Sequence, residues 1–383
     1  MVGFLGLDGP FRQPAGCVIE SAPGKTLRNF HGVATRVSID TSRNKAATAT
    51  LSFTAPVDEN DNWLIQDSEE ISVGESLLLS ARFSPLEIVP IFDGIITSIS
   101  PSYSKSRGEA SVQVQCKDKT VLMDREFRKR SWSVDDQMDD IRFVTDMAAL
   151  HGLTADTDNQ NGLTKFPNVQ NNTDAGFMYD RAGRSAYEFY IRDNEVYFGP
   201  LRLSADPQPN INIYAGRQTN CLEFKLDHDG TKADKIMATV ASESGDGVEQ
   251  VEVQSDLDIM GPSLAKNTNS PLGENIRYMT RNRTPHLEDT EKYAQAHANR
   301  EVMNSIKATG ELDGALYAHI LKIGLPVGVS GGGKTYNGRY YVDSVVHDFS
   351  REGYKQKFTL LRNGIGDDLE YKPNVIADVL GRT

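Results

Sequence analysis

The strongest constraint on the fold is a series of short segments in which apolar and polar residues alternate. Residues 112–117 read Val-Gln-Val-Gln-Cys-Lys, which places three apolar side chains on one face of a strand and three polar ones on the other. Similar strand patterns occupy residues 36–40, 47–53, 75–83 and 91–100, with Gly, Pro, Asn and Asp between them. Several short strands with this punctuation predict a β-barrel or sandwich over residues 1–122.

The pattern changes after Asp118. Ser133 and Asp136 suit the start of a helix, Ile141, Val144 and Ala148 follow at helical spacing, and Gly152 suits its end. A second helix is predicted over residues 173–190, and a strand over residues 195–199. We therefore predict a small α+β insert over residues 123–205.

Strand patterns resume after the insert, over residues 211–214, 221–227, 235–241 and 248–254. Residues 261–275 are polar and predict a long surface loop. Pro285 suits the first position of a long helix near residues 285–307, which Gly310 would end. We predict a second β domain over residues 206–364 and a C-terminal tail over residues 365–383.

One segment matches a nucleotide-binding motif. Gly328, Gly333, Lys334 and Thr335 fit G-x-x-x-x-G-K-[ST], the phosphate-binding loop of ATPases. That loop works because it leads into a helix whose free N–H groups hold the phosphates. Here Asn-Gly and a run rich in aromatic and β-branched residues follow, which predict a turn and a strand. We therefore interpret the match as a false Walker A motif in a flexible loop between strands, with no helix.

Charge and cysteine content exclude other classes. The 53 acidic and 41 basic residues give a net charge of −12, which disfavours stable nucleic-acid binding, and the basic run at residues 124–131 is interpreted as a solvated or interface segment. Cys17, Cys116 and Cys221 are too few and too far apart for a disulfide framework or a zinc knuckle. No signal peptide or membrane span is predicted.

The histidines and acids suggest no metal or cofactor site. His347 lies in a strand pattern without a second histidine at ligand spacing, and His286 and His297 lack a third ligand. The loop that holds Asp156 and Asp158 departs from the EF-hand pattern. We predict no catalytic residue, no cofactor and no metal, although two acids that face each other across a sugar remain open as an alternative.

The order of several short pieces resembles the phage late control D family, the central baseplate hub proteins of contractile phage tails and related injection systems, including the hub part of VgrG-like spikes. The likeness covers roughly residues 118–364. The pieces that carry it in the C-terminal part are residues 338–342, 345–347, 353–354 and 358–362.

The resemblance implies a mainly β fold with an α+β insert, in which two tail-tube-like β-barrels flank the insert. It also implies a homotrimer that joins a six-fold tail tube to a three-fold spike and leaves a channel for cargo. Its implied partners are the tail tube protein, the spike protein, other baseplate proteins and the tape measure protein. Its implied place is the virion or injection particle, assembled in the bacterial cytoplasm.

We interpret the chain as a structural protein and not as an enzyme. The tail after the second barrel is a candidate docking segment for the spike or another partner, through Ile365, Asp367, Asp368, Leu369 and Tyr371. The alternatives are a peptidoglycan-degrading enzyme of the tail tip and, more remotely, a P-loop nucleotide hydrolase.

Overall fold

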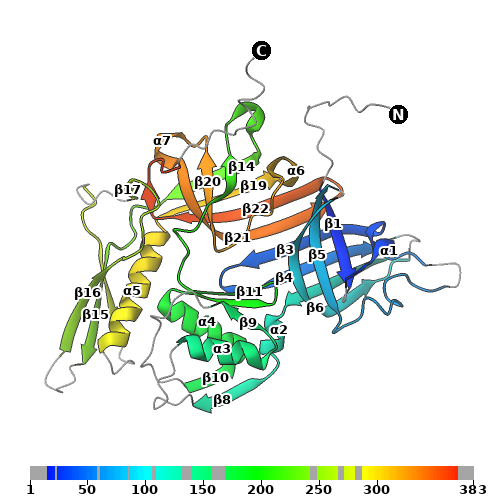
Figure 1. Cartoon of the computed structure of the whole chain (residues 1–383), viewed down its shortest axis with the longest axis horizontal. Helices are drawn as coiled ribbons and strands as arrows, with labels where there is room; N and C mark the ends of the chain where they lie inside the picture. The colour runs from blue at the N-terminus through cyan, green and yellow to red at the C-terminus, as the bar shows by residue number, and fades with distance from the viewer. Residues whose placement is uncertain are drawn as a thin grey trace.

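The fold is dominated by antiparallel β-sheet (Figure 1). It is taken from a computed structural model, which describes residues 15–21, 24–57, 61–84, 86–105, 109–131, 140–156, 169–241, 248–265, 271–280 and 287–369. Within these residues the largest sheet has 13 strands. The predicted fold class, mainly β with an α+β insert, is confirmed.

The first β region follows the alternation of the sequence closely. Along β7 every second side chain is buried, because the apolar residues fall on the face that packs on the core and the polar ones face solvent. The elements of this region are β1 (Gly16–Ser21), β2 (Lys25–Thr26), α1 (Arg28–His31), β3 (Ala34–Ser42), β4 (Lys45–Thr54), β5 (Ser76–Ser84), β6 (Glu87–Ser102) and β7 (Ser111–Asp118).

The second β region lies beside the first. Its strands β21 and β22 are the long ones at the centre of Figure 1. Its elements are β13 (Gln208–Asn212), η1 (Gly216–Gln218), β14 (Cys221–His228), β17 (Ser263–Leu264), β19 (Ile306–Asp313), α6 (Gly314–Tyr317), β20 (Pro326–Ser330), α7 (Gly333–Tyr336), β21 (Gly338–Ser350), β22 (Gly353–Arg362) and β23 (Gly364–Ile365).

The two β regions share one continuous sheet. Its main path runs β14-β19-β22-β21-β3-β4-β7-β6-β5-β1-β2, with β20 also paired to β21 and β13 to β20. The contact between the regions is the antiparallel pairing of β21 with β3, which extends over seven residue pairs from Ser344–Ser42 to Ser350–Arg36. We call this pairing the seam. Phe349 and Tyr354 of the second region pack into the core of the first, so the two cores also interlock.

The insert is a compact α+β unit with its own core. Helices α3 and α4 pack against a three-stranded sheet in the order β11-β12-β9, and Val144, Met178 and Phe189 are fully buried between them. Its elements are α2 (Thr120–Met123), β8 (Phe127–Ser131), α3 (Asp140–Leu150), β9 (Thr154–Asp156), β10 (Val169–Thr173), α4 (Asp174–Ser185), β11 (Glu188–Arg192) and β12 (Glu195–Gly199).

A separate lobe projects from the second β region, at the left of Figure 1. It consists of β15 (Lys235–Ala241), β16 (Val248–Gln254), β18 (Ile276–Thr280) and α5 (Leu287–Met303). Buried alanines of α5, Ala294 and Ala298, lie against Ile236 and Ala238 of β15. Small side chains at this contact let the helix approach the sheet closely. None of the described helices is long and apolar enough to cross a membrane.

Both long helices end earlier than predicted. Helix α4 stops at Ser185 because Ala186 takes a left-handed conformation with φ 52°, so Glu188 lies in strand β11 and not in a helix. Helix α5 stops at Met303, and strand β19 starts at Ile306.

The prediction that Gly310 ends the long helix was also wrong, because Gly310 lies within β19. A Cβ atom there would lie 2.2 Å from the Glu223 carbonyl oxygen and 2.5 Å from Cζ of Phe358. The position therefore needs glycine for the close approach of its neighbours. The proposed helix-start residues Ser133, Asp136 and Pro285 lie outside the described residues.

Candidate functional site

The phosphate-loop match lies in an exposed turn of the second β region. Strand β20 contains Gly328, and a single helical turn, α7, contains Gly333, Lys334 and Thr335. The prediction of a loop without any helix was therefore wrong, because one helical turn is present. The predicted strand then follows at once, as β21. Lys334 and Thr335 are both exposed.

The backbone of this turn is occupied by contacts within the protein. The Gly332 amide donates to Oδ1 of Asn337 at 2.9 Å, and the Thr335 carbonyl accepts from the Gly366 amide at 2.8 Å. A phosphate loop instead directs free N–H groups at the start of a longer helix toward the ligand. The interpretation as a false motif stays a prediction, and this geometry is consistent with it.

The first part of the proposed docking tail is folded back onto the second β region. Ile365 lies in β23, which pairs with β17. Asp368 accepts hydrogen bonds from the Arg339 amide at 2.8 Å and from Nε of Arg339 at 2.7 Å. Asp367 accepts from the Leu369 amide. The fifth proposed residue, Tyr371, lies outside the described residues.

Arg362 fixes the base of this tail. Its guanidinium is fully buried and lies over the Tyr340 ring, 4.9 Å from the ring centre. It donates to the Met260 carbonyl at 2.8 Å, to the Asn337 carbonyl at 2.9 Å and to the Gly366 carbonyl. Because one cation satisfies three carbonyls from separate segments, the chain is held in place where it leaves β22.

Of the histidines considered in the sequence, His347 lies in β21 and His297 in α5. His347 is buried in the seam with Nδ1 2.8 Å from the Tyr354 hydroxyl, and burial lowers the pKa of His347 to about 3. His297 packs against Tyr293, whereas His286 lies outside the described residues, as does Asp158. Among the described residues, no group of three or more His, Cys, Asp or Glu side chains is placed to hold a metal ion.

A set of largely buried charges lies where the two β regions and the insert meet. We call it the junction cluster: Arg43, Glu188, Arg202, Tyr341 and Asp343. Arg43, in the turn between β3 and β4, donates to Glu188 of the insert at 2.7 Å and to Asp343 of β21 at 2.8 Å. The Tyr341 hydroxyl donates to the second oxygen of Glu188 at 2.9 Å and accepts from the Arg202 amide at 3.0 Å.

Electrostatics in the junction cluster follow from burial. The Glu188 side chain has no exposed surface, and burial raises its pKa even though Arg43 and Tyr341 donate to it. Burial alone would lower the pKa of Arg43, but the carboxylates of Glu188 and Asp343 raise it above the ordinary value. The cluster therefore holds three separate parts of the chain together through charges that have little access to water.

Sequence reasoning missed the junction cluster for two reasons. Glu188 was predicted to be helical, and Arg43 lies in an ordinary turn. The ladder between β21 and β22 shifts register at Asp343, which leaves this residue as an extra one in β21 and lets it face Arg43. A bulge of this kind has no reliable signature in a single sequence.

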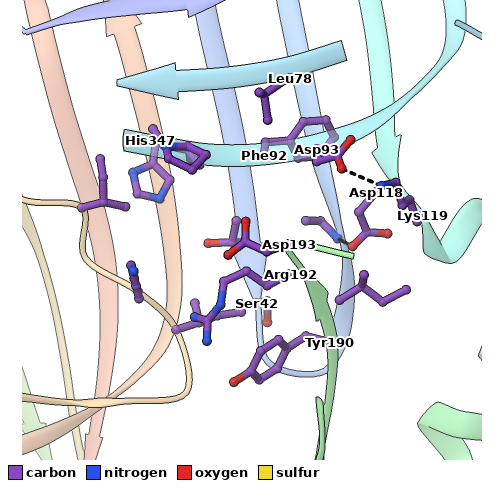
Figure 2. Close-up of a pocket in the computed structure, with 18 of the residues that line it drawn as sticks. Ser42, Leu78, Phe92, Asp93, Asp118, Lys119, Tyr190, Arg192, Asp193 and His347 are labelled. Atoms are coloured by element: carbon purple, nitrogen blue, oxygen red, sulfur yellow. Dashed lines mark hydrogen bonds and ion pairs between the residues drawn. The ribbon is translucent and has the colours of Figure 1, made fainter. Parts of the chain in front are cut away.

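A cavity of about 130 Å³ lies between the first β region and the insert. Figure 2 shows Leu78 and Phe92 of β5 and β6 at one side of this cavity, and Arg192 and Tyr190 of β11 at the opposite side. The turn between β11 and β12 also lines the cavity, and both turn residues, Asp193 and Asn194, have positive φ as in a tight hairpin.

The ionisable groups of the cavity differ in how far they are paired. Lys119 is paired with Asp93 at 2.6 Å and also donates to Asn194. Asp118 is buried and accepts from the Ala47 and Thr120 amides, and burial raises its pKa to about 6. In the described part of the chain, Nη1 of Arg192 is buried and has no hydrogen-bond partner.

A family model described as the Alg8 N-terminal domain matches residues 19–351. No curated protein matches the chain in sequence.

Several solved structures share the fold over nearly the whole chain. A tail protein from Neisseria meningitidis MC58 aligns with a TM-score of 0.66 and 14% identity over 92% of this chain and 98% of its own. The 43 kDa tail protein of prophage MuSo2 from Shewanella oneidensis aligns with a TM-score of 0.65 and 13% identity over 91% and 98%.

A third similar structure comes from a secretion system. It is an E. coli component of the type VI secretion system, itself described as similar to the T4 bacteriophage tail proteins gp27 and gp5. It aligns with a TM-score of 0.56 and 12% identity over 90% of this chain and 77% of its own. At these identities the comparisons show the fold alone, which this chain shares with two phage tail proteins and a component of the type VI secretion system.

Proposed function

The chain belongs to the family defined by the Alg8 N-terminal domain model, and we propose that it is a structural component of a phage tail or a related injection particle, the central hub of a contractile baseplate. The family description names neither a reaction nor a ligand. The proposal therefore takes the function from the fold.

The observation that carries the proposal is the extent of the shared fold. The two tail proteins align over 98% of their own length and over more than nine-tenths of this chain, so β regions, insert and lobe are matched together. A chance likeness of one β domain would not extend across all of these parts. The membership of the late control D family, implied by the sequence, stays part of the proposal.

The proposed assembly is a homotrimer, in which two tube-like β regions per chain supply six similar units to a ring. Among the described strands, β14 pairs with β19 alone and so forms one end of the 13-stranded sheet. An open strand edge leaves backbone donors and acceptors without partners, and natural proteins cover such edges. Closure of a ring through β14 would cover it and leave a channel at the centre.

Native mass spectrometry of the purified chain tests the trimer. The expected result is a species of three copies of the 42.3 kDa chain. Leu222→Lys provides a variant at the β14 edge, where the leucine is 54% exposed, and Leu272→Lys at 66% exposure before β18 provides the matched control. A lysine at the edge should convert trimer to monomer, whereas the control should remain a trimer.

Native mass spectrometry with Mg-ATP and an assay of peptidoglycan digestion separate the alternatives. A monomer that binds one Mg-ATP, with binding lost in Lys334→Ala, would support a nucleotide hydrolase and contradict the hub. Release of soluble muropeptides from purified peptidoglycan would support the tail-tip enzyme. A monomer at every concentration, with and without a spike protein, would refute the trimeric hub.

A further inference from the structure

The cavity between the first β region and the insert carries an inference that is independent of the proposed assembly. We propose that it is a binding site for a small monoanionic carboxylate with an aromatic or branched aliphatic body. Three features lead to this class of ligand: apolar walls, a buried guanidinium nitrogen without a hydrogen-bond partner, and acids that disfavour a higher charge.

The walls define the body of the ligand. Leu78, Val89, Ile91 and Phe92 from β5 and β6 line one side, and Ile320 and Ile323 from the loop before β20 line another. The cavity of about 130 Å³ is close to the size of an apolar cavity of roughly 150 Å³ that accepts benzene. The space therefore fits one phenyl ring or one branched aliphatic chain.

Arg192 defines the head group. It lies at the end of β11, with its guanidinium 5.5 Å from the centre of the Tyr190 ring. Its Nη1 atom is buried without a hydrogen-bond partner, and no acidic group among the described residues forms an ion pair with it. A buried donor of this kind is costly to leave unpaired, and a planar guanidinium is suited to bind a carboxylate through two parallel hydrogen bonds.

The other ionisable groups favour a single negative charge. Lys45 and Lys322 also line the cavity as exposed side chains, and these two cations favour an anion there. Asp93, Asp118 and Asp193 line it as well, and their carboxylates would repel a dianion. A carboxylate fits this balance better than a phosphate monoester does.

The test uses three probes that share a phenyl ring: 3-phenylpropionate, its neutral amide, which has the same shape as the acid, and phenyl phosphate. Ligand-observed NMR and isothermal titration calorimetry on the full chain should give a Kd of about 1 mM or below for the acid, as small ligands of this size reach. The amide should bind at least about tenfold more weakly, because it lacks the charge that pairs with Arg192.

Two variants locate the site. Arg192→Gln should weaken the binding of 3-phenylpropionate by about tenfold or more, whereas Arg217→Gln, at an exposed arginine in η1, should leave it unchanged. Val89→Phe should also abolish binding, because the larger side chain fills the apolar space while Arg192 stays in place. Far-UV circular dichroism of each variant should match that of the natural chain.

Three results would overturn the proposal. They are the absence of binding at about ten times the expected Kd, equal affinity for acid and amide, and equal affinity of the Arg192→Gln and Arg217→Gln variants. Tighter binding of phenyl phosphate than of 3-phenylpropionate would overturn the monoanionic class.

Discussion

Removal of one charged partner from the Arg43–Glu188 pair of the junction cluster should lower the unfolding free energy strongly. Replacement of both partners by apolar residues should lower it much less than the sum of the two single changes. Arg43 is 12% exposed and its partner Glu188 is fully buried. Replacement of Arg43 by leucine leaves the Glu188 carboxylate buried without its cation. Loss of one partner of a buried pair costs about 3–5 kcal/mol of unfolding free energy. Glu188→Leu should cost a similar amount, because Arg43 then retains Asp343 alone.

The double variant Arg43→Leu/Glu188→Leu removes both charges at once. Its remaining costs are the Tyr341 hydroxyl, which loses its acceptor at about 1–3 kcal/mol, and Asp343, which loses Arg43 but is 31% exposed and so keeps access to water. Two single losses of about 3–5 kcal/mol would sum to far more, so the double-mutant cycle should give a coupling energy of about 3 kcal/mol or greater.

A second ion pair between β3 and β21 serves as the matched control. Arg36 and Asp348 form two hydrogen bonds, at 2.8 and 2.7 Å, but the Arg36 side chain is 56% exposed. Because water screens an exposed pair, Arg36→Leu should cost no more than about 1 kcal/mol. The contrast between Arg43 and Arg36 therefore tests burial and not the number of hydrogen bonds.

The assay is urea unfolding by far-UV circular dichroism at one protein concentration, with conversion to free energy where the m-value is unchanged. If Arg43→Leu and Arg36→Leu shift the midpoint equally, or if the double variant costs the sum of the singles, the assigned role of the junction cluster is refuted.

Three further predictions concern single positions. His347 is buried with a pKa of about 3, below the value of about 6.5 in the unfolded chain. Its contribution to stability is therefore present above the unfolded-chain pKa and is lost as the pH falls toward 3. His347→Gln should flatten this fall in urea midpoints between pH 7 and pH 4, and His319→Gln, at an exposed histidine, should not. Gly310→Ala should cost about 1–3 kcal/mol, read from its urea midpoint, because its Cβ would overlap the Glu223 carbonyl and the Phe358 ring. Lys334→Ala should change the unfolding free energy by no more than about 0.5 kcal/mol, because this lysine is exposed.

Each of these predictions has a contradicting result. Identical pH profiles for both histidine variants would show that His347 is not held neutral by burial. An unchanged midpoint for Gly310→Ala would show that β14 and β22 shift apart without cost. A large loss of stability or of assembly in Lys334→Ala would give the phosphate-loop match a structural role.

The sequence predicted the elements whose information is local. Strands such as β7 and β21 were found because alternation and β-branched or aromatic content are properties of a few adjacent residues. The end of α4 was missed because Ala186 takes the left-handed conformation that usually requires glycine. Asn304 and Ser305 are a weak sequence signal for the end of α5. The side-chain amide of Asn304 caps the helix by donating to the Arg300 carbonyl.

The contacts that build the candidate site were beyond local reasoning. Arg192 lines the cavity only because β11 of the insert packs beside β4 of the first β region, and no spacing in the sequence records that contact. The junction cluster likewise depends on a bulge at Asp343 and on segments that are 145 and 300 residues apart from Arg43. Such residues become visible when the fold places them together, because their pairing is set by tertiary packing.

The seam also has a consequence for synthesis on the ribosome. Its two strands are separated by most of the chain, since Arg36 and Asp348 are 312 positions apart. At bacterial translation rates of about 5–20 residues per second, β3 waits roughly 15–60 s before its partner emerges. During that interval the nascent first region presents an open strand edge to other nascent chains on the same polysome. Slower, cooler expression or a holdase chaperone should therefore raise the soluble yield more for this chain than for one whose sheet closes locally.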